Sequence, residues 1–381
     1  MKKGEERRKK STPRAKWLRI IGKIAKTTAI CLLCIILLPV AVCAVAKIIN
    51  GLDAKIKTEN GVQEKIYVEI DNTKQYLYIR GEDKNNPVIL FVHGGPGSPM
   101  AYTGYAWQTE LEDSYTFVQW DQRGSGRTYY ENPGSEPPTA GLLMSDMDAV
   151  VDYLRGRFGQ QKIIVMGHSW GSILGTRYIK QHPEKVFAYI GVGQVINMKQ
   201  GDVLAAEYAI KLAGQAANSE DAERIQACLD IYMGSNDISD NGFLENFALL
   251  RSLTAKYLPS DGTVNGLPMM WMGLASPDMS WRDMKWFLAQ AAMNDVFLDA
   301  NIKLLEECMV FDIRDEAPAY DVPVYFITGE NDWITPASLA EEYFDTVDAP
   351  KKKMVVIKST GHNTFIDNPE DFCETVKALL G

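Results

Sequence analysis

The feature that most restricts the fold is residues 162–182, where a strand pattern passes through a serine-centred turn into a helix pattern. KIIVMGH at 162–168 is almost wholly apolar and rich in branched residues, as expected for a parallel strand covered on both faces. SILGTRYIKQH at 172–182 then repeats apolar residues at helical spacing and ends before Pro183. A strand that turns directly into a helix is typical of layered α/β proteins.

The same alternation recurs on both sides of this segment. Helical patterns lie at 142–158 and 370–381. Strand-like runs are KIYVEI, QYLYIR, PVILFVH (87–93), YTFVQWD (115–121), VFAYIGVG (186–193), VPVYFITG (322–329) and KMVVIKS (353–359). Alternating strands and helices predict an α/β fold with a doubly wound, mostly parallel sheet. We expect this core to span residues 62–194 and 318–381.

Between residues 195 and 317 the alternation stops. AAEYAIKLAGQA and DAERIQACLDIYM are helical patterns, and residues 268–287 are rich in Met and Trp. A helical insertion after the sixth core strand predicts a helical lid over the site. The alternative for the Met/Trp stretch is that it forms only the ordinary interior of that lid.

The N-terminal region predicts a membrane anchor. Residues 27–46 are 20 residues without a charge, enough for a helix to span the roughly 30 Å hydrocarbon core of a bilayer. We therefore predict a basic tail at 1–26, a transmembrane helix at 27–47 and a polar linker at 48–61. Twelve Lys or Arg but only two acids occur in residues 1–47, which favours a cytoplasmic N-terminus and an extracellular catalytic domain in a single-pass protein of the cell membrane.

A cleaved signal peptide is the alternative topology. Ala44-Val45-Ala46 fits a small-residue cleavage site, so the protein would then be secreted after cleavage near Ala46. The apolar stretch is longer than the usual signal core of about 7–15 residues, which favours an uncleaved anchor.

Charge and cysteine content exclude several classes of function. Removing residues 1–47 from the totals of 40 basic and 49 acidic residues leaves 28 and 47, so the remaining chain is strongly acidic. Such a body repels phosphate backbones, which argues against nucleic acid as a partner. Outside the apolar span only Cys228, Cys308 and Cys373 remain, without CxxC spacing. This pattern predicts neither a disulfide framework nor a metal site, and we expect no cofactor.

The sequence Gly167-His168-Ser169-Trp170-Gly171 is a G-x-S-x-G motif between the strand and the helix described above. Such a turn is sharp enough to need glycine on both sides, and it presents the serine hydroxyl at the sheet edge. The start of the following helix favours a developing negative charge. Ser169 is the predicted nucleophile.

A serine hydroxyl needs a base, and the base needs a carboxylate that fixes its tautomer. Of four histidines, His93 ends a strand, His182 ends a helix, and His168 is expected to point to the wrong side of the turn. His362 follows the last strand and is the predicted base. The predicted acid is Asp332, which follows the strand at 322–329, and Glu330 is the competing acid.

The remaining element is His93-Gly94-Gly95-Pro96-Gly97, directly after a strand. Glycines leave backbone N–H groups uncovered. We expect the N–H groups of Gly95 and Trp170 to converge on the substrate oxygen as an oxyanion hole.

These motifs resemble the prolyl iminopeptidase family of α/β-hydrolases. The resemblance rests on HGGPG, DQRGSG at 121–126, GHSWGS and GENDWITP, in the family's order, over roughly residues 62–194 and 318–381. It implies an α/β-hydrolase fold, removal of N-terminal residues, preferentially proline, from peptides without a metal, and a triad of Ser169, Asp332 and His362.

Two departures from the family pattern limit what the resemblance implies. The family often has glycine at the position of His168, and a basic membrane anchor is not typical of it. The family's lid acids, which bind the free amine of the substrate, have no clear counterpart, so Glu207, Asp278, Glu306 and Glu307 are candidates only. The sequence therefore predicts an aminopeptidase of peptides, or alternatively an esterase or amidase for small apolar substrates.

Overall fold

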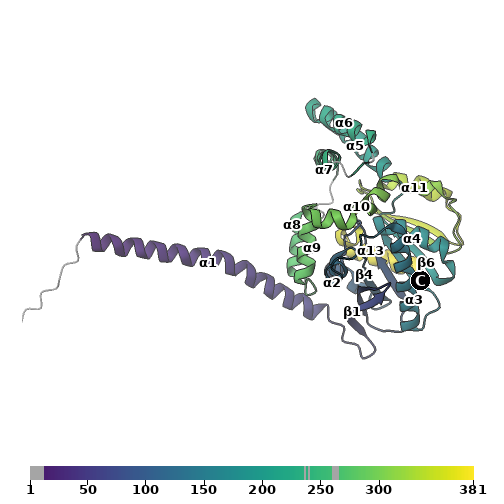
Figure 1. Ribbon diagram of the computed structural model, residues 1–381, viewed down its shortest axis with the longest axis horizontal. Helices are drawn as coiled ribbons and strands as arrows, with labels where there is room; N and C mark the ends of the chain where they lie inside the picture. Colours follow the sequence, from purple (N-terminus) through teal and green to yellow (C-terminus); the bar gives the residue numbers. More distant parts are fainter. Residues whose placement is uncertain (1–12, 236, 239–240, 260–265) are drawn as a thin grey trace, which may run out of the picture.

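The computed structural model describes residues 13–381 except 236, 239–240 and 260–265. Its body is built on an eight-stranded sheet in the order β1-β2-β4-β3-β5-β6-β7-β8 (Figure 1). The strands are β1 (Val62–Ile70), β2 (Thr73–Gly81), β3 (Val88–Val92), β4 (Thr116–Asp121), β5 (Ile163–His168), β6 (Val186–Val192), β7 (Val324–Gly329) and β8 (Lys352–Ile357).

The sheet is mostly parallel, as predicted. β1 pairs with β2, and β2 with β4, in antiparallel fashion, while the strands from β4 through β8 pair in parallel. Every strand overlaps one of the apolar runs predicted from the sequence. The five strands β3 to β7 are buried almost throughout, because helices cover both of their faces.

Two apolar cores lie on opposite faces of the sheet. Leu90 and Val92 of β3 point into one core, whereas Ile89 and Phe91 point into the other, following the two-residue period of a strand. The first face is covered by α3 (Ala140–Phe158), α4 (Trp170–Gln181) and α11 (Ala337–Thr346). The second is covered by α13 (Pro369–Leu380), the short helix α12 (Thr364–Asp367) and the 3₁₀ segments η1 (Ala101–Ala106) and η2 (Gln108–Glu110).

The chain between β6 and β7 is helical over most of its described residues. Its helices are α5 (Met198–Gln215), α6 (Ser219–Gly234), α7 (Asn241–Thr254), α8 (Gly266–Ala275), α9 (Trp281–Ala291) and α10 (Asp295–Val310). Polar side chains cap several of them: Ser280 and Asp283 form a capping box at α9, and Asn294 caps α10. In Figure 1, α6 lies farther from the sheet than α9 and α10.

The N-terminal helix α1 (Pro13–Asp53) extends away from the body (Figure 1). Within the described residues it is the one helix long and apolar enough to cross a membrane, with a mean hydropathy of 3.0 in its most apolar part. The helix continues past residue 47, so the first part of the predicted linker at 48–61 is helical. The physical reason is that Lys47 and Asn50, near the end of α1, contact the chain at the end of α8 and just after it.

Candidate active site

Ser169 lies on a strained turn between β5 and α4. Its φ of 52° and ψ of −122° are unusual for a residue other than glycine. The turn is possible because Gly171 and Gly167 carry no Cβ: one at Gly171 would overlap the carbonyl oxygen of Val92, and one at Gly167 would lie 2.6 Å from the Gly171 oxygen. The Ser169 N–H donates to the Val192 carbonyl at 3.0 Å, which fixes the turn against β6.

Asp332 and His362 are hydrogen-bonded, with 2.9 Å between His362 Nδ1 and Asp332 Oδ2. The Asp332 carboxylate is buried and also accepts from the N–H groups of Ile334 and Thr335 at 2.9 and 2.8 Å and from the Thr335 hydroxyl at 2.7 Å. Burial alone raises the pKa of Asp332, but the interactions with His362 and Thr335 outweigh it and hold that pKa below its ordinary value. Asp332 is therefore ionised and fixes a proton on His362 Nδ1.

Ser169 and His362 line the same cavity, which has a volume of about 450 Å³. Gly193, at φ 54°, makes room for the imidazole, because a Cβ there would lie 3.1 Å from its Nδ1. No hydrogen bond joins the Ser169 hydroxyl to His362 in the part of the chain that the structure describes. The structure thus brings the three predicted catalytic residues to one site and hydrogen-bonds two of them.

The Gly94–Gly97 loop borders this cavity beside Ser169. Gly95 and Gly97 have φ values of 115° and 78°, which only glycine adopts readily. Within the described residues, neither the Gly95 N–H nor the Trp170 N–H donates to another group. Both predicted oxyanion-hole donors are therefore available next to the serine turn.

The inserted helices hold that glycine loop in place. The Trp286 indole N–H of α9 donates to the Gly97 carbonyl at 2.7 Å, and the Gln290 amide donates to the Ser98 hydroxyl. Asn301 of α10 packs so closely on Gly97 that a Cβ there would lie 2.6 Å from its side-chain oxygen. Sequence reasoning missed these three residues, since only the folded chain shows that the insertion contacts the loop.

The DQRGSG segment at 121–126 does not line the cavity, but it holds residues adjacent in sequence to some that do. Gln122 donates to the His93 carbonyl at 2.9 Å and accepts from the Trp170 indole at 3.2 Å, which connects the glycine loop to the start of α4. Arg123 forms a double hydrogen bond to buried Asp146, with both distances 2.7 Å.

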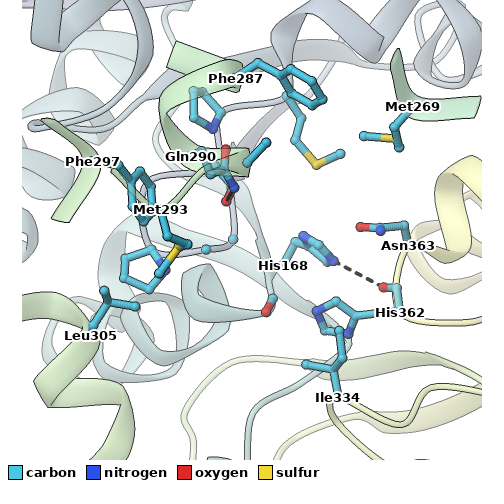
Figure 2. A pocket seen from close by; sticks show the side chains of 18 of the residues that line it. His168, Met269, Phe287, Gln290, Met293, Phe297, Leu305, Ile334, His362 and Asn363 are labelled. Atoms are coloured by element: carbon cyan, nitrogen blue, oxygen red, sulfur yellow. Dashed lines mark hydrogen bonds between the residues drawn. The ribbon is translucent and has the colours of Figure 1, made fainter. Parts of the chain in front are cut away.

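Apolar side chains from the inserted helices form a large part of the cavity wall. Figure 2 shows Met269 of α8, Phe287 of α9, Phe297 of α10 and Met293 around the space above His168 and His362. Arg251 of α7 is the one Lys or Arg of the wall among the described residues, and it is paired with Asp202 at 3.0 Å. No carboxylate from the described residues lines this cavity.

His168 also lines the cavity, so the prediction that it points to the wrong side of the turn was wrong. Its ring packs between Phe91 and Phe365, and its Nε2 lies 3.2 Å from the His362 carbonyl oxygen. The ring lies on this side because side chains alternate along β5, so that His168 points to the same face of the sheet as Ile164 and Met166. Burial, with the neighbouring His362, lowers the pKa of His168 to about 3, so the ring is neutral.

The alternatives to His362 and Asp332 are His93, His182 and Glu330, and each of them has other partners. Buried His93 accepts from the Gln122 N–H at 3.2 Å, and burial lowers its pKa to about 4. His182 lies beside Asp148 and Glu184 near the surface. Glu330 accepts from the Ser359 N–H at 3.0 Å. His93, His182 and Glu330 therefore support local structure, in contrast to Asp332 and His362.

The candidate substrate-binding acids are not brought to the cavity. Glu207 and Glu306 are exposed, and Glu307 pairs with Arg177 at 2.7 Å. Asp278 is buried, where it pairs with Lys65 at 2.6 Å and accepts from the Tyr78 hydroxyl at 3.0 Å. Acidic character alone misled the selection, because each of these groups has water or a structural partner instead.

Known proteins with similar sequence and structure agree with this architecture. The alpha/beta hydrolase fold family matches residues 87–369. The chain is 30% identical over 314 residues to a probable aminopeptidase, YbaC, of Bacillus subtilis, covering 81% of this chain and 93% of that protein. A proline iminopeptidase of Xylella fastidiosa is 34% identical over 118 residues, 30% of this chain and 34% of its own length.

A solved structure of proline iminopeptidase from Mycobacterium smegmatis shares the fold. It has a TM-score of 0.57 at 21% identity and covers 83% of this chain and 97% of its own. The chain therefore belongs to the α/β-hydrolase fold family and is a hydrolase with relatives named as aminopeptidases and proline iminopeptidases.

Proposed function

We propose that the protein is a serine hydrolase in which Ser169 attacks the substrate carbonyl and forms an acyl-enzyme. The observation that carries this proposal is the Asp332–His362 hydrogen bond of 2.9 Å at a cavity that Ser169 also lines. Because Asp332 holds the proton on Nδ1, His362 Nε2 is free to accept the Ser169 proton. His362 then protonates the leaving amine or alcohol, and water releases the acyl group.

The tetrahedral intermediate needs donors for its oxyanion. The N–H groups of Gly95 and Trp170 supply them, supported by the N-terminus of the 12-residue helix α4. Losing one such donor typically costs about 10²–10³ in rate. Trp286 and Gln290 contribute indirectly, by holding the glycine loop in position.

The inserted helices act as a lid that provides the acyl-binding pocket. Met269, Phe287 and Phe297 give the cavity an apolar wall above the reacting serine. An apolar wall favours substrates with a hydrophobic group on the acyl side of the bond that is cleaved. In this proposal, the described helices between residues 195 and 317 cover the core formed by residues 62–194 and 318–381.

The substrate proposed first is a peptide with a small apolar or proline N-terminus, which makes the protein an aminopeptidase. The similarity to YbaC over most of both chains supports this choice. A second candidate is an ester or amide with no free amine. It is favoured by the absence of a carboxylate among the described residues of the cavity wall, since a buried ammonium needs an opposite charge.

One comparison separates the two substrates. Proline 4-nitroanilide and its N-acetylated form differ only in the amine, so an aminopeptidase hydrolyses the first and not the second. Equal rates on both compounds would favour the amidase instead. The nucleophile is tested by fluorophosphonate labelling of the full chain: Ser169→Ala should abolish labelling, whereas Ser172→Ala, in the first turn of α4, should retain it.

The proposal also includes a membrane anchor, with α1 spanning the bilayer and the catalytic domain outside. The apolar helix and the basic residues before it support this topology. Release after cleavage near Ala46 is the alternative. Alkaline carbonate extraction of membranes tests it: an anchored enzyme stays in the pellet at full length, and a secreted enzyme appears in the medium without residues 1–46.

A further inference from the structure

Exposed apolar side chains occur on α8 and α9, the two inserted helices whose connecting residues contact the end of α1. They are Met270 and Trp271 of α8 and Trp281 and Leu288 of α9, here called the lid patch. Trp271 is 48% exposed and Trp281 is 68% exposed. Where such exposed apolar side chains are contiguous on the surface, they usually mark an interaction site.

The end of α1 is joined directly to this part of the lid. The Asn50 amide donates to the Ala275 carbonyl at 2.9 Å, and the Lys47 ammonium lies 3.5 Å from the Met279 carbonyl. A Cβ on Gly51 would come within 3.2 Å of Pro277, so the two segments pack closely. Figure 1 shows α8 and α9 on the side of the body from which α1 extends.

Buried polar groups make this junction rigid. Arg80 of β2 donates to the Ala54 carbonyl just after α1 and forms a buried ion pair with Glu112 at 2.6 Å. Arg80 also donates to the Tyr78 hydroxyl at 2.9 Å, and that hydroxyl donates to Asp278 in the loop between α8 and α9. The direction of α1 relative to the lid is therefore fixed by hydrogen bonds at several points.

These contacts show at which point along α1, and therefore at which depth relative to the bilayer, the lid patch lies. Residues 47 and 50 come directly after the uncharged stretch at 27–46, so they lie where a spanning helix leaves the hydrocarbon core. Trp271 is one helical turn from Ala275, and Trp281 is two residues from Met279. Tryptophan is enriched at this level of a membrane, where its ring remains apolar and its N–H reaches water.

We propose that the lid patch docks on the lipid surface of the membrane that α1 enters. Lys285, whose ammonium lies 5.7 Å from the Trp281 ring, and Lys47 place positive charge at the same level, which suits anionic lipid headgroups. α8 contributes Met269 to the cavity wall and exposes Met270 and Trp271. Docking therefore places one wall of the cavity next to lipid and favours substrates that partition into the bilayer.

Tryptophan quenching in the full-length protein tests the docking without reference to catalysis. The protein is reconstituted into nanodiscs of phosphatidylcholine with a minority of phosphatidylglycerol, with or without bromine on the acyl chains near the headgroup. We expect bromine to quench the wild type more than the double variant Trp271→Phe/Trp281→Phe. Trp333→Phe is the matched control, because it removes an indole that stacks on Tyr208 of α5 and not one of the lid patch. The fraction of fluorescence quenched in this variant should be at least as large as in the wild type. Equal quenching of the wild type and the double variant overturns the proposal. The same result is expected if a second copy of the protein covers the lid patch, because that copy shields the patch from lipid.

A second measurement tests the substrate preference and rests on the proposed hydrolase activity. In nanodiscs, Trp271→Glu/Trp281→Glu should slow hydrolysis of a long-chain 4-nitrophenyl ester in the bilayer several-fold, while hydrolysis of soluble 4-nitrophenyl butyrate stays unchanged. Phe187→Glu, an exposed aromatic at the start of β6, should change neither rate. An equal effect on both esters overturns the substrate preference. If neither ester is hydrolysed, the preference for substrates in the bilayer is overturned. The 4-nitroanilide comparison and the labelling of Ser169 then still decide the proposed activity, and the quenching experiment still decides the docking.

Discussion

The Nε2–H of His168 donates to the backbone carbonyl oxygen of His362 at 3.2 Å. A carbonyl can only accept, and burial keeps the ring neutral by lowering its pKa to about 3, so the single ring proton lies on Nε2. The residue before the proposed nucleophile therefore holds the loop that carries the proposed base. His168 acts as a positioning residue in this arrangement.

Loss of that hydrogen bond should impair catalysis more than binding. His168→Phe keeps a ring between Phe91 and Phe365 but removes the donor, whereas His168→Gln retains a side-chain N–H at a similar reach. We expect kcat to fall about fivefold to tenfold in His168→Phe, which corresponds to one hydrogen bond of about 1 kcal/mol. KM should change little, and His168→Gln should recover most of the rate. Equal kcat values for the two variants would show that the donor is not needed.

Asp332 should matter far more than its neighbour Glu330. Asp332→Asn lets His362 carry its proton on Nε2, where it cannot accept from Ser169, so kcat should fall by about 10³–10⁴. Glu330→Gln keeps an acceptor for the Ser359 N–H and should leave kcat within about twofold, since that side chain does not contact His362. Steady-state kinetics on one chromogenic substrate compare them. Similar losses in both variants would contradict the assignment of Asp332.

The sheet and the positions of the proposed catalytic residues could be predicted from the sequence, because both depend on local patterns. Strands buried on both faces, such as β3 and β5, are continuous apolar runs. Ser169 is recognisable because glycine must flank so tight a turn. Asp332 and His362 follow adjacent parallel strands, so they had to meet at one edge of the sheet.

Contacts between distant segments were beyond such patterns. The Trp286–Gly97 hydrogen bond joins residues 189 positions apart, and nothing in a Met/Trp-rich helix indicates that one indole reaches the glycine loop. The hydrogen bond of His168 to the His362 carbonyl depended on where the last loop packs, although the side of the sheet to which His168 points follows from the alternation along β5. The continuation of α1 past residue 47 depended on contacts of Lys47 and Asn50 with the inserted segment, whereas their polarity alone suggested a linker.

The buried carboxyl of Asp121 should make stability depend on pH. Burial, with the nearby charge of Asp283, raises the pKa of Asp121 to about 7 despite the neighbouring Arg127. Between an unfolded pKa of about 3.9 and this value the native state binds more protons. The free energy of unfolding therefore loses a contribution from Asp121 as pH rises to 7, and that contribution stays lost above 7.

Asp121→Asn removes this titration and keeps an acceptor for the Arg127 N–H. The variant should gain roughly 2–4 kcal/mol relative to wild type at about pH 8.5 compared with about pH 5. Urea unfolding at the two pH values measures the difference. Asp113→Asn is the control without a pH effect: slight burial is outweighed there by hydrogen bonds from Ser114 and Lys377, which lower the pKa of Asp113. Asp113 is therefore ionised in the native and unfolded states at both pH values, and this variant should differ from wild type by the same amount at each. A gain that is the same at both pH values would contradict the titration of Asp121.

The indole of Trp286 should be needed for the glycine loop to work as an oxyanion hole. Trp286 is 1% exposed, and its N–H donates to the Gly97 carbonyl at 2.7 Å. Trp286→Phe keeps an aromatic ring in the lid but leaves that carbonyl without its donor, so the loop gains freedom to move away from Ser169. We expect kcat to fall about tenfold while fluorophosphonate still labels Ser169.

Trp333→Phe is the matched control, because the Trp333 N–H has no acceptor among the described residues, and its kcat should be unchanged. The proposed oxyanion donors lie in the core, and Trp286 lies in the inserted helices. An unchanged kcat in Trp286→Phe would therefore mean that the inserted helices do not organise the proposed oxyanion hole.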